Sequence, residues 1–447
     1  MESEQYSKFS YRSIWQLAWP IIVSNLLMTL TMTVDLIMVG RLGSGSIAAV
    51  GLSNQLTFFA TSLMIATSVG TVAIISRHEG AGERDRANDI LSQSIYIGAI
   101  LAIPLMVIGL TLGRPILALI GSEPEVAALG GGYIRVVALA APFMFINTLC
   151  IAAFRALGDT RTPLIIGAMI NALNIFFNYV FIFGRLGMPR LGVEGAALGT
   201  AMALMAGTLV FIAVLAGGKL GFSLPHPLPA LDMADIKRIM RVSVPAGVEQ
   251  LVIQIGFMVF TVIILRFGTE VYAAHQVGMR IQSLAFLPGM GFSIAAATLV
   301  GQSLGANRSD LAGDFGRGCM KLSMVTMIIM TVFVFTLARP IAWIFTDEHV
   351  VIDNATVWIR ILTLGIPAFA VFFTLAGALR GAGDSRFPLY ASVLGLYAIR
   401  LPMALVLGFF TPLGVYGVWL SLSLEYYFRA AFIEWRFRKG AWKDIDV

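Results

Sequence analysis

The chain is a succession of long apolar runs separated by short polar segments. Each run is long enough, or nearly so, for the roughly 20 residues that a helix needs to cross a bilayer. Within the runs, hydrophobic residues are continuous and do not alternate with polar ones, which favours helices over the strands of a membrane barrel. Twelve runs can be counted, near residues 14–39, 47–75, 90–113, 127–153, 163–184, 192–217, 242–265, 272–300, 316–345, 354–379, 387–410 and 413–435.

Composition agrees with this pattern. Of 447 residues, 58% are hydrophobic and 13% are charged, whereas a soluble protein has about 25% charged residues. We therefore predict an all-α polytopic membrane protein with twelve transmembrane helices, embedded in the lipid bilayer. The net charge of +6 belongs to short loops and does not indicate a nucleic-acid partner. Neither a metal-ligand motif nor a pair of acids suited to catalysis is visible, so we expect no enzymatic activity, no metal centre and no cofactor.

The two halves of the chain repeat each other. A shift of 225 residues places Pro20 on Pro245, and aligns FRALGDTRTPL (154–164) with LRGAGDSRFPL (379–389). Each half holds an even number of runs, so both insert in the same orientation, as parallel repeats with a cavity at their interface. We expect an N-terminal six-helix lobe at 1–217, a linker at 218–241, and a C-terminal six-helix lobe with a short tail at 242–447.

Charge predicts the orientation. Lysines and arginines are concentrated in the segments that would share the side of the N-terminus, and few lie on the other side. By the positive-inside rule, both termini and the linker are then cytoplasmic. The arginines expected outside are Arg41, Arg114, Arg185, Arg190, Arg266 and Arg339.

Asp35 is an acid within the first apolar run. An acid at the centre of a membrane helix costs roughly 2.5–3.5 kcal/mol on insertion scales, so such a residue is a functional candidate. One interpretation is that Asp35 reaches the outer interface, about one turn from the end of its helix. The other is a carboxyl group that faces a cavity, where it would bind a proton, or a sodium ion if further oxygen atoms converge on it.

The fifth run offers such oxygen atoms. Asn171, Asn174 and Asn178 lie on one helix face, because their spacing is i, i+3 and i+7. Amide side chains at this depth must face protein or water, and they serve either a site or hydrogen bonding between helices. Thr200 in the sixth run is a weaker candidate, because a threonine among small residues is more often there for packing.

Glu249 in the seventh run is a secondary acid candidate. It follows Pro245 by about one turn, and water could reach it because it lies only about 10 Å from the expected start of the helix. Pro20 in the first run is the candidate for a helix bend, because proline lacks the N–H that would continue the hydrogen-bond ladder.

Several motifs together resemble a known family over essentially the whole chain. They are VDLIMVGRLG around Asp35, the paired G-D-[ST]-R-x-P-L loops, NIFFNYVFIFG in the fifth run and GVEGAALGT in the sixth. This set is similar to the multidrug and toxic compound extrusion (MATE) transporters. The resemblance implies two six-helix lobes in a V, alternating access, and export of cationic or amphipathic compounds against protons or sodium.

The resemblance also implies roles for single residues. Asp35 matches the essential acid of the first helix, Pro20 its bend, and Asn174 the asparagine of an N-lobe cation site, with Thr200 as a possible match on the sixth helix. Asn178 stands where members with that site have an aspartate, which puts sodium in doubt. Other members place a second site on a glutamate of the seventh helix and an aspartate of the tenth. Residues 355–379 contain no acid, so Glu249 matches only weakly.

We therefore expect a monomeric antiporter for small organic substrates in the cell (inner) membrane, with protons preferred over sodium as the coupling ion at Asp35. Two rival functions stay open. A flippase for lipid-linked oligosaccharides, from the wider superfamily, would need cationic residues lining its cavity, and only four arginines lie within or near the runs. A membrane-embedded enzyme would need the metal cluster or paired acids that the sequence does not display.

Overall fold

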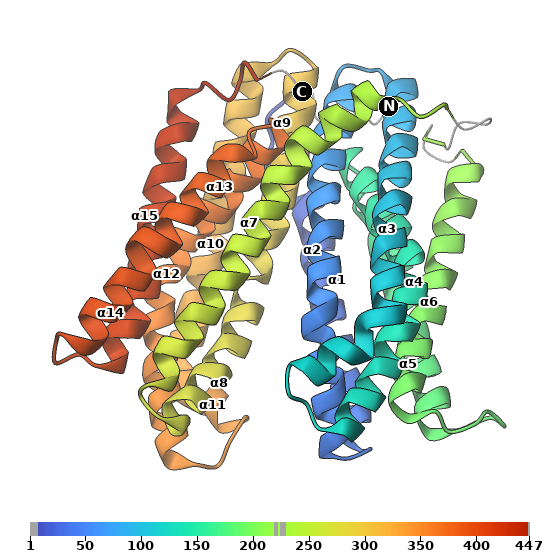
Figure 1. Ribbon diagram of the computed structural model, residues 1–447. Helices are drawn as coiled ribbons and strands as arrows, with labels where there is room; N and C mark the ends of the chain where they lie inside the picture. The colour runs from blue at the N-terminus through green and yellow to red at the C-terminus, as the bar shows by residue number, and fades with distance from the viewer. Residues whose placement is uncertain (1–7, 219–221, 224–228, 446–447) are drawn as a thin grey trace. The chain divides into compact units, whose positions relative to one another are not determined.

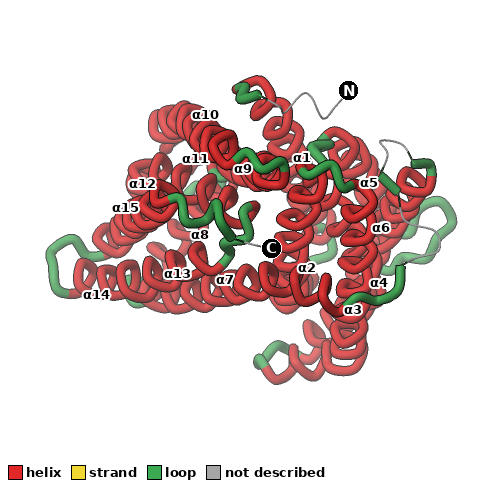
Figure 2. Tube along the Cα trace, turned by 90° about the horizontal axis from the view of Figure 1, so that it is seen from above, coloured by secondary structure: helices red, strands yellow, loops and turns green. Residues whose placement is uncertain are grey.

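Every regular element of the structure, a computed structural model that describes residues 8–218, 222–223 and 229–445, is a helix (Figures 1 and 2). This confirms the all-α prediction. The first half of the chain forms α1 (Tyr11–Gly40), α2 (Ser44–Gly80), α3 (Arg84–Leu119), α4 (Pro124–Ala156), α5 (Arg161–Phe183) and α6 (Gly192–Ala216). The second half forms α7 (Met233–Leu265), α8 (Thr269–Ala285), α9 (Leu287–Gly305), α10 (Ser309–Thr336), α11 (Ala338–Trp343), α12 (His349–Gly381), α13 (Arg386–Val393), the π-helical segment η3 (Leu394–Arg400), α14 (Leu401–Phe409) and α15 (Val415–Lys439).

The predicted duplication appears in the helix boundaries. Four helices of the second half begin 225 residues after their counterparts, at Ser44 and Thr269, Arg84 and Ser309, Pro124 and His349, and Arg161 and Arg386. Scattered sequence matches could arise by chance, but a constant offset in helix starts requires that both halves fold in the same way. The repeat is therefore a property of the structure as well as of the sequence.

Eleven segments of the described chain are long and apolar enough to cross a membrane. Two of them are interrupted: α8 and α9 meet at Phe286, just before Pro288, and the span Arg386–Phe409 contains the π-helical segment. The expected twelfth span is α15, which has 25 residues. It fails a purely apolar criterion because it carries charged side chains such as Glu425 and Arg429, which are buried within the protein.

The two G-D-[ST]-R loops are helix connections, as the sequence suggested. Gly158 and Gly383 adopt the left-handed backbone, with φ of 91° and 89°, which glycine tolerates without a steric penalty. In the first loop the Asp159 carboxylate accepts hydrogen bonds from the backbone N–H groups of Arg161 and Thr162, both at 3.0 Å. These bonds satisfy N–H groups that have no partner in the first turn of α5.

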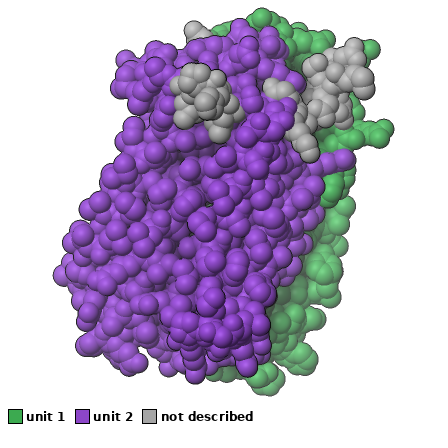
Figure 3. All heavy atoms as spheres, turned by 90° about the vertical axis from the view of Figure 1, so that its right-hand side faces the viewer, with its two compact units in different colours: residues 1–22, 244–447 green, residues 23–243 purple. Residues whose placement is uncertain are grey.

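The chain divides into two compact units, coloured separately in Figure 3. Unit 1 comprises residues 1–22 and 244–447, and unit 2 comprises residues 23–243. They differ from the expected lobes at 1–217 and 242–447 because α1 and α7 each change unit partway along their length. In unit 2, α4 packs against α2, α3 and α6, and in unit 1 its counterpart α12 packs against α8, α9, α10 and α15.

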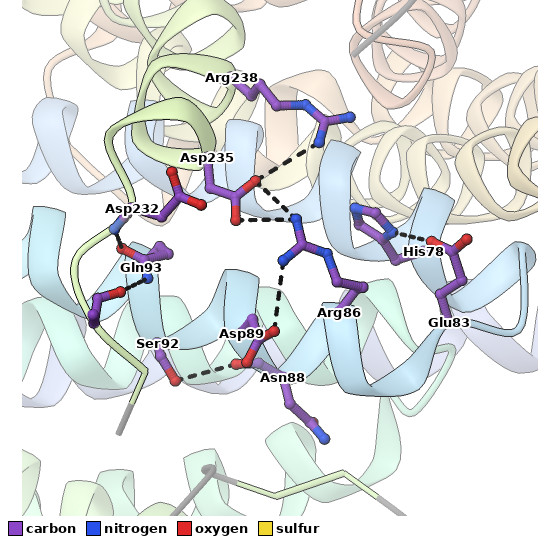
Figure 4. Close-up of polar contacts among 11 residues, drawn as sticks. His78, Glu83, Arg86, Asn88, Asp89, Ser92, Gln93, Asp232, Asp235 and Arg238 are labelled. Carbon is purple, nitrogen blue, oxygen red and sulfur yellow. Dashed lines mark hydrogen bonds and ion pairs between the residues drawn. The ribbon is translucent and has the colours of Figure 1, made fainter. Parts of the chain in front are cut away.

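The described part of the linker is fastened to α3 (Figure 4). Gln93 donates to the carbonyl of Ala230 at 2.8 Å and accepts from the N–H of Asp232 at 3.0 Å, and Arg86 pairs with Asp235 at 3.3 Å. Two further bonds have the same effect, from Tyr96 to Pro229 and from Ser223 to Asn88. The linker is also shorter than the expected 218–241, because charged residues from Met233 onward already form the first turns of α7; Pro225 and Pro227 lie outside the described residues.

Candidate cation site

Asp35 lies in the second half of α1, within unit 2, among apolar residues of its own helix. Three threonines that precede Asp35 on α1 donate hydrogen bonds from their hydroxyl groups to backbone carbonyls of the same helix. Thr29 donates to the carbonyl of Asn25, Thr31 to Leu27 and Thr33 to Thr29, at 2.9–3.0 Å. These hydroxyl hydrogens are therefore already used, and Asp35 finds its partners on other helices.

The structure brings together all four residues of the site predicted in the first half. The Asn178 amide donates to Asp35 Oδ1 at 2.8 Å and to Asn174 Oδ1 at 3.2 Å. Asn174 donates in turn to Thr200 Oγ1 at 2.9 Å, and this hydroxyl donates to the carbonyl of Ala196 at 3.0 Å. Asn174 and Asn178 are buried, with 5% and 0% of their surface exposed. We call Asp35, Asn174, Asn178 and Thr200 the Asp35 group.

The Asn174 amide fits its surroundings in a second orientation, turned by half a turn. Its nitrogen then donates to Asp35 Oδ1 at 3.0 Å and Oδ2 at 3.2 Å, and its oxygen accepts from Thr200 at 2.9 Å when that hydroxyl turns away from the Ala196 carbonyl. An ionised Asp35 favours this turned orientation, because a carboxylate accepts hydrogen bonds and donates none. The first orientation places the amide oxygen beside the carboxyl oxygens, where it suits a protonated Asp35. The preferred orientation of Asn174 therefore depends on the charge of Asp35.

Two glycines of α6 allow this contact between helices. A Cβ at Gly199 would lie 2.1 Å from Asn178 Oδ1 and 2.8 Å from its backbone nitrogen, and one at Gly195 would lie 2.6 Å from the backbone of Phe181. Their i, i+4 spacing places both on one face of α6. The small-residue face lets the two backbones approach closely, as is common between membrane helices, and it fixes Asn178 beside Asp35.

The oxygen atoms of the Asp35 group determine which ions the site can bind. Among the described residues, no cluster of three or more His, Cys, Asp or Glu side chains is placed to hold a metal ion. The site offers one carboxyl group with amide and hydroxyl oxygens around it, and Tyr133 of α4 interacts with Asp35 electrostatically. Such a group can bind one proton at the carboxyl, or one hard cation if the amide oxygens turn towards it.

Glu249 lies elsewhere, on the part of α7 that belongs to unit 1. It is 1% exposed, and both of its oxygens are occupied, by Arg380 at 2.7 Å and by the Ser392 hydroxyl at 2.8 Å. The structure therefore shows it as the partner of Arg380, an arginine that is partly exposed. The second candidate outside the Asp35 group, Pro20, lies within α1, which is continuous from Tyr11 to Gly40.

Sequence reasoning missed a second buried polar group. Glu425 of α15 is fully buried, and it is paired with Arg400 and Arg429. Arg400 is one of the four arginines that lie within or near the apolar runs of the sequence. A signal was available: Glu425 follows Thr200 by the repeat offset of 225, so it occupies the equivalent position in the second half.

Both halves of the chain match the model of a known protein family. The MatE family model matches residues 20–180 and again residues 245–406. The chain belongs to the MATE family. The two matches begin 225 residues apart, so the MATE model itself recognises the internal repeat.

Relatives of similar length are found among curated proteins. The chain is similar to the probable multidrug resistance protein NorM of Thermotoga maritima, 29% identical over 98% of this chain and 94% of that protein. It is also similar to the uncharacterized transporter YisQ of Bacillus subtilis, 25% identical over 96% of this chain and 94% of that protein.

Solved structures share the MATE fold. An outward-facing multidrug resistance MATE transporter of the MOP superfamily superposes with a TM-score of 0.92 at 22% identity, covering 99% of this chain and 98% of the other. A MOP superfamily transporter from Pyrococcus furiosus, whose binding pocket is described as having reverse polarity, gives a TM-score of 0.92 at 21% identity and 99% coverage of both chains. At this identity the likeness establishes the fold alone.

The close contact at Gly199 yields a prediction. In Gly199→Ala, the added methyl group displaces Asn178 from Asp35, and we expect a destabilisation of about 1–3 kcal/mol, typical of overpacking. Gly51→Ala on α2 is the matched control, because a Cβ there meets nothing within 4 Å, and alanine should be neutral or stabilising in a helix by up to about 1 kcal/mol. Thermal unfolding of the purified variants measures both effects. Equal melting temperatures for the two variants would show that Gly199 does not set the contact.

Proposed function

We propose that this protein is a secondary active antiporter that exports cationic or amphipathic organic compounds in exchange for protons, by alternating access. One observation carries the proposal: among the residues that the structure describes, the partners of Asp35, a carboxyl group on an apolar membrane helix, are amide groups of α5 and not a fixed positive charge. The names of curated relatives such as NorM support multidrug compounds as the substrate class. The protein needs no cofactor for this activity, and we propose that it acts as a monomer.

The choice of the proton rests on the number of carboxylates. A proton requires one carboxyl group that gains and loses it as its surroundings change, and Asp35 is the carboxylate in the described hydrogen-bond network. A hard cation such as sodium favours several oxygen ligands and usually more than one carboxylate. Asn178 supplies an amide where a second acid would serve, so the group suits a proton better.

In the exchange cycle, protonation of Asp35 neutralises a partly buried carboxylate, which then no longer requires two amide donors. Asn174 then turns its amide, and its oxygen accepts the hydrogen bond from the protonated acid. The hydrogen bonds that connect α1 to α5 and α6 change with the ion, and Pro20 supplies the weak point at which α1 bends. The bend couples release of the substrate to uptake of the proton.

A lipid-linked oligosaccharide flippase is the second candidate function. We consider it because the binding pocket of the Pyrococcus furiosus relative is described as having reverse polarity. Anionic headgroups would need arginines that are free to bind them. In this protein the deeply placed Arg400 and Arg429 share Glu425, and Arg380 pairs with Glu249. These ion pairs favour the export of cationic compounds.

We also propose that both termini are cytoplasmic, because of the charge bias of the loops. Single cysteines placed in the turn near Gly82 and in the turn near Gly121 test this orientation after replacement of Cys150 and Cys319. An impermeant thiol reagent applied to whole cells should label the cysteine near Gly121 and not the one near Gly82. Labelling near Gly82 from outside would reverse the orientation.

Asp35→Asn tests the coupling site. The amide keeps the shape of a protonated Asp35 and cannot release a proton, so the variant should fold yet lose export driven by a pH gradient, down to the rate of protein-free liposomes. Glu125→Gln is the control, because Glu125 is an exposed acid at the start of α4 and is not a member of the Asp35 group. Transport of ethidium into proteoliposomes under an imposed pH gradient measures both. Proton-driven export by Asp35→Asn at the rate of the unchanged protein would end the mechanism.

Asn178→Asp tests the choice of ion. The substitution places a second carboxylate beside Asp35, and two adjacent negative charges favour a bound cation between them. We expect ethidium export by this variant to respond to sodium, whereas export by the unchanged protein does not. Asn354→Asp, near the start of α12 in unit 1, controls for the added charge. Sodium-driven export by the unchanged protein, without a pH gradient, would refute the choice of the proton and keep Asp35 as the site.

A further inference from the structure

The repeat predicts where a second copy of the Asp35 group should lie. Addition of 225 to the four residue numbers leads to positions in unit 1 that hold a different set of side chains. The acid at the α1 position is replaced by an aromatic residue, both asparagines by apolar residues, and the threonine of α6 by an acid. The counterparts are Phe260, Ile399, Met403 and Glu425. The second half therefore retains one acid in this layer, on a different helix.

This acid has fixed cations around it. Glu425 is 0% exposed, and its Oε2 accepts from Arg400 Nη2 at 2.7 Å. Its Oε1 is in contact with Arg429, which lies one turn further along α15. Both arginines are buried, at 1% and 4% exposure. Each oxygen of the carboxylate thus faces a guanidinium group that is covalently attached to the protein.

The surroundings are shaped to hold these cations. The Arg400 guanidinium lies over the rings of Phe257, Phe260 and Tyr426, at 5.2–5.6 Å from their centres, where cation–π attraction stabilises the positive charge. Phe260 is the counterpart of Asp35. The aromatic residue at the repeated position therefore contacts the very arginine that neutralises the acid of unit 1.

The backbone adapts to the same group. Arg400 is the last residue of the π-helical segment Leu394–Arg400, a local widening that is frequent at functional sites. Gly395 within this segment leaves room for the ion pair, since a Cβ there would lie 2.7 Å from Arg429 Nε and 3.1 Å from Glu425 Oε1. The counterpart helix α5 contains no such segment.

Other titratable groups border the network. His275 of α8 interacts electrostatically with Arg400, and Glu249 of α7 with Arg429. Arg429 also donates to the Ser392 hydroxyl at 3.4 Å, the hydroxyl that in turn donates to Glu249. Glu249 is itself neutralised by Arg380. Both buried glutamates of unit 1 are therefore occupied by guanidinium groups.

We propose that unit 1 contains a permanently occupied counterpart of the Asp35 group, in which the tethered guanidinium of Arg400 takes the place of the exchanged cation. Loss of one partner from a buried ion pair leaves an uncompensated charge and is strongly unfavourable, so a proton or a sodium ion cannot displace the arginine during transport. Ions are therefore exchanged at Asp35 alone, one in each cycle. This inference rests on the proposed function.

The coupling ratio tests the inference. Ethidium carries one positive charge, so the exchange of one proton for one ethidium moves no net charge across the membrane, whereas the exchange of two protons for one ethidium moves one. Ethidium flux in proteoliposomes is therefore measured at a fixed pH gradient while the membrane potential is varied. A flux that does not change with the potential indicates one proton per ethidium, and a flux that changes with it and stops at a null potential indicates two. We expect one for the unchanged protein. A ratio of two would overturn the inference, and this measurement does not depend on any variant folding.

Variants separate this inference from the proposed function. The double variant Glu425→Gln with Arg400→Gln removes one negative and one positive charge, so the net charge of the cluster is unchanged, and Arg429 keeps its hydrogen bonds to Ser392. Its ethidium flux should remain independent of the membrane potential even if its rate falls. Arg400→Lys keeps a tethered cation and should do the same. A ratio of two that falls to one in the double variant would assign an exchanged proton to Glu425 and refute the inference while leaving Asp35 in place. Coupled export by Asp35→Asn would instead refute the proposed function.

Discussion

The constraint on which this structure depends is that a polar group inside an apolar helix bundle must find a partner there. Asp35 meets it with the amides of Asn174 and Asn178, which supply N–H donors, and no arginine or lysine of the described chain is recorded as its partner. Hydrogen bonds to an ionised acceptor are stronger than neutral ones, but they leave the acid free to gain or lose a proton. An amide partner stabilises the negative charge of the carboxylate but does not neutralise it, so the carboxyl group can still take up and release a proton.

The same constraint is met differently in the other unit. Glu425 and Glu249 are each paired with arginine, and a buried ion pair of this kind resists separation because each partner would leave an unpaired charge. The acids of the two halves therefore differ in their partners, which are amides in one half and guanidinium groups in the other. The repeated fold provides equivalent positions, and our proposal that ions are exchanged at Asp35 rests on this difference in the side chains at those positions.

The sequence predicted those features that depend on local or periodic signals. The offset of 225 appears in both the residues and the helix starts, and the asparagine face of α5 was visible from its spacing. The pairing of Glu425 with Arg400 was not predicted, because it joins residues 25 positions apart on different helices. The start of α7 was placed too late, because its first turns are charged and lie outside the apolar run that served as the signal.

Prolines mark the places where the chain passes between units. The boundary in α1 falls between Ile22 and Val23, two residues after Pro20, and the boundary in α7 falls between Ser243 and Val244, just before Pro245. Each helix is continuous across its boundary, yet each lacks one backbone hydrogen bond near it, since proline has no N–H. The first half of α1 belongs to unit 1 and its second half carries Asp35 in unit 2. Asp35 therefore lies on a helix that both units share, on the far side of the turn that Pro20 deprives of a hydrogen bond, and this is why a change in its partners is proposed to act through α1.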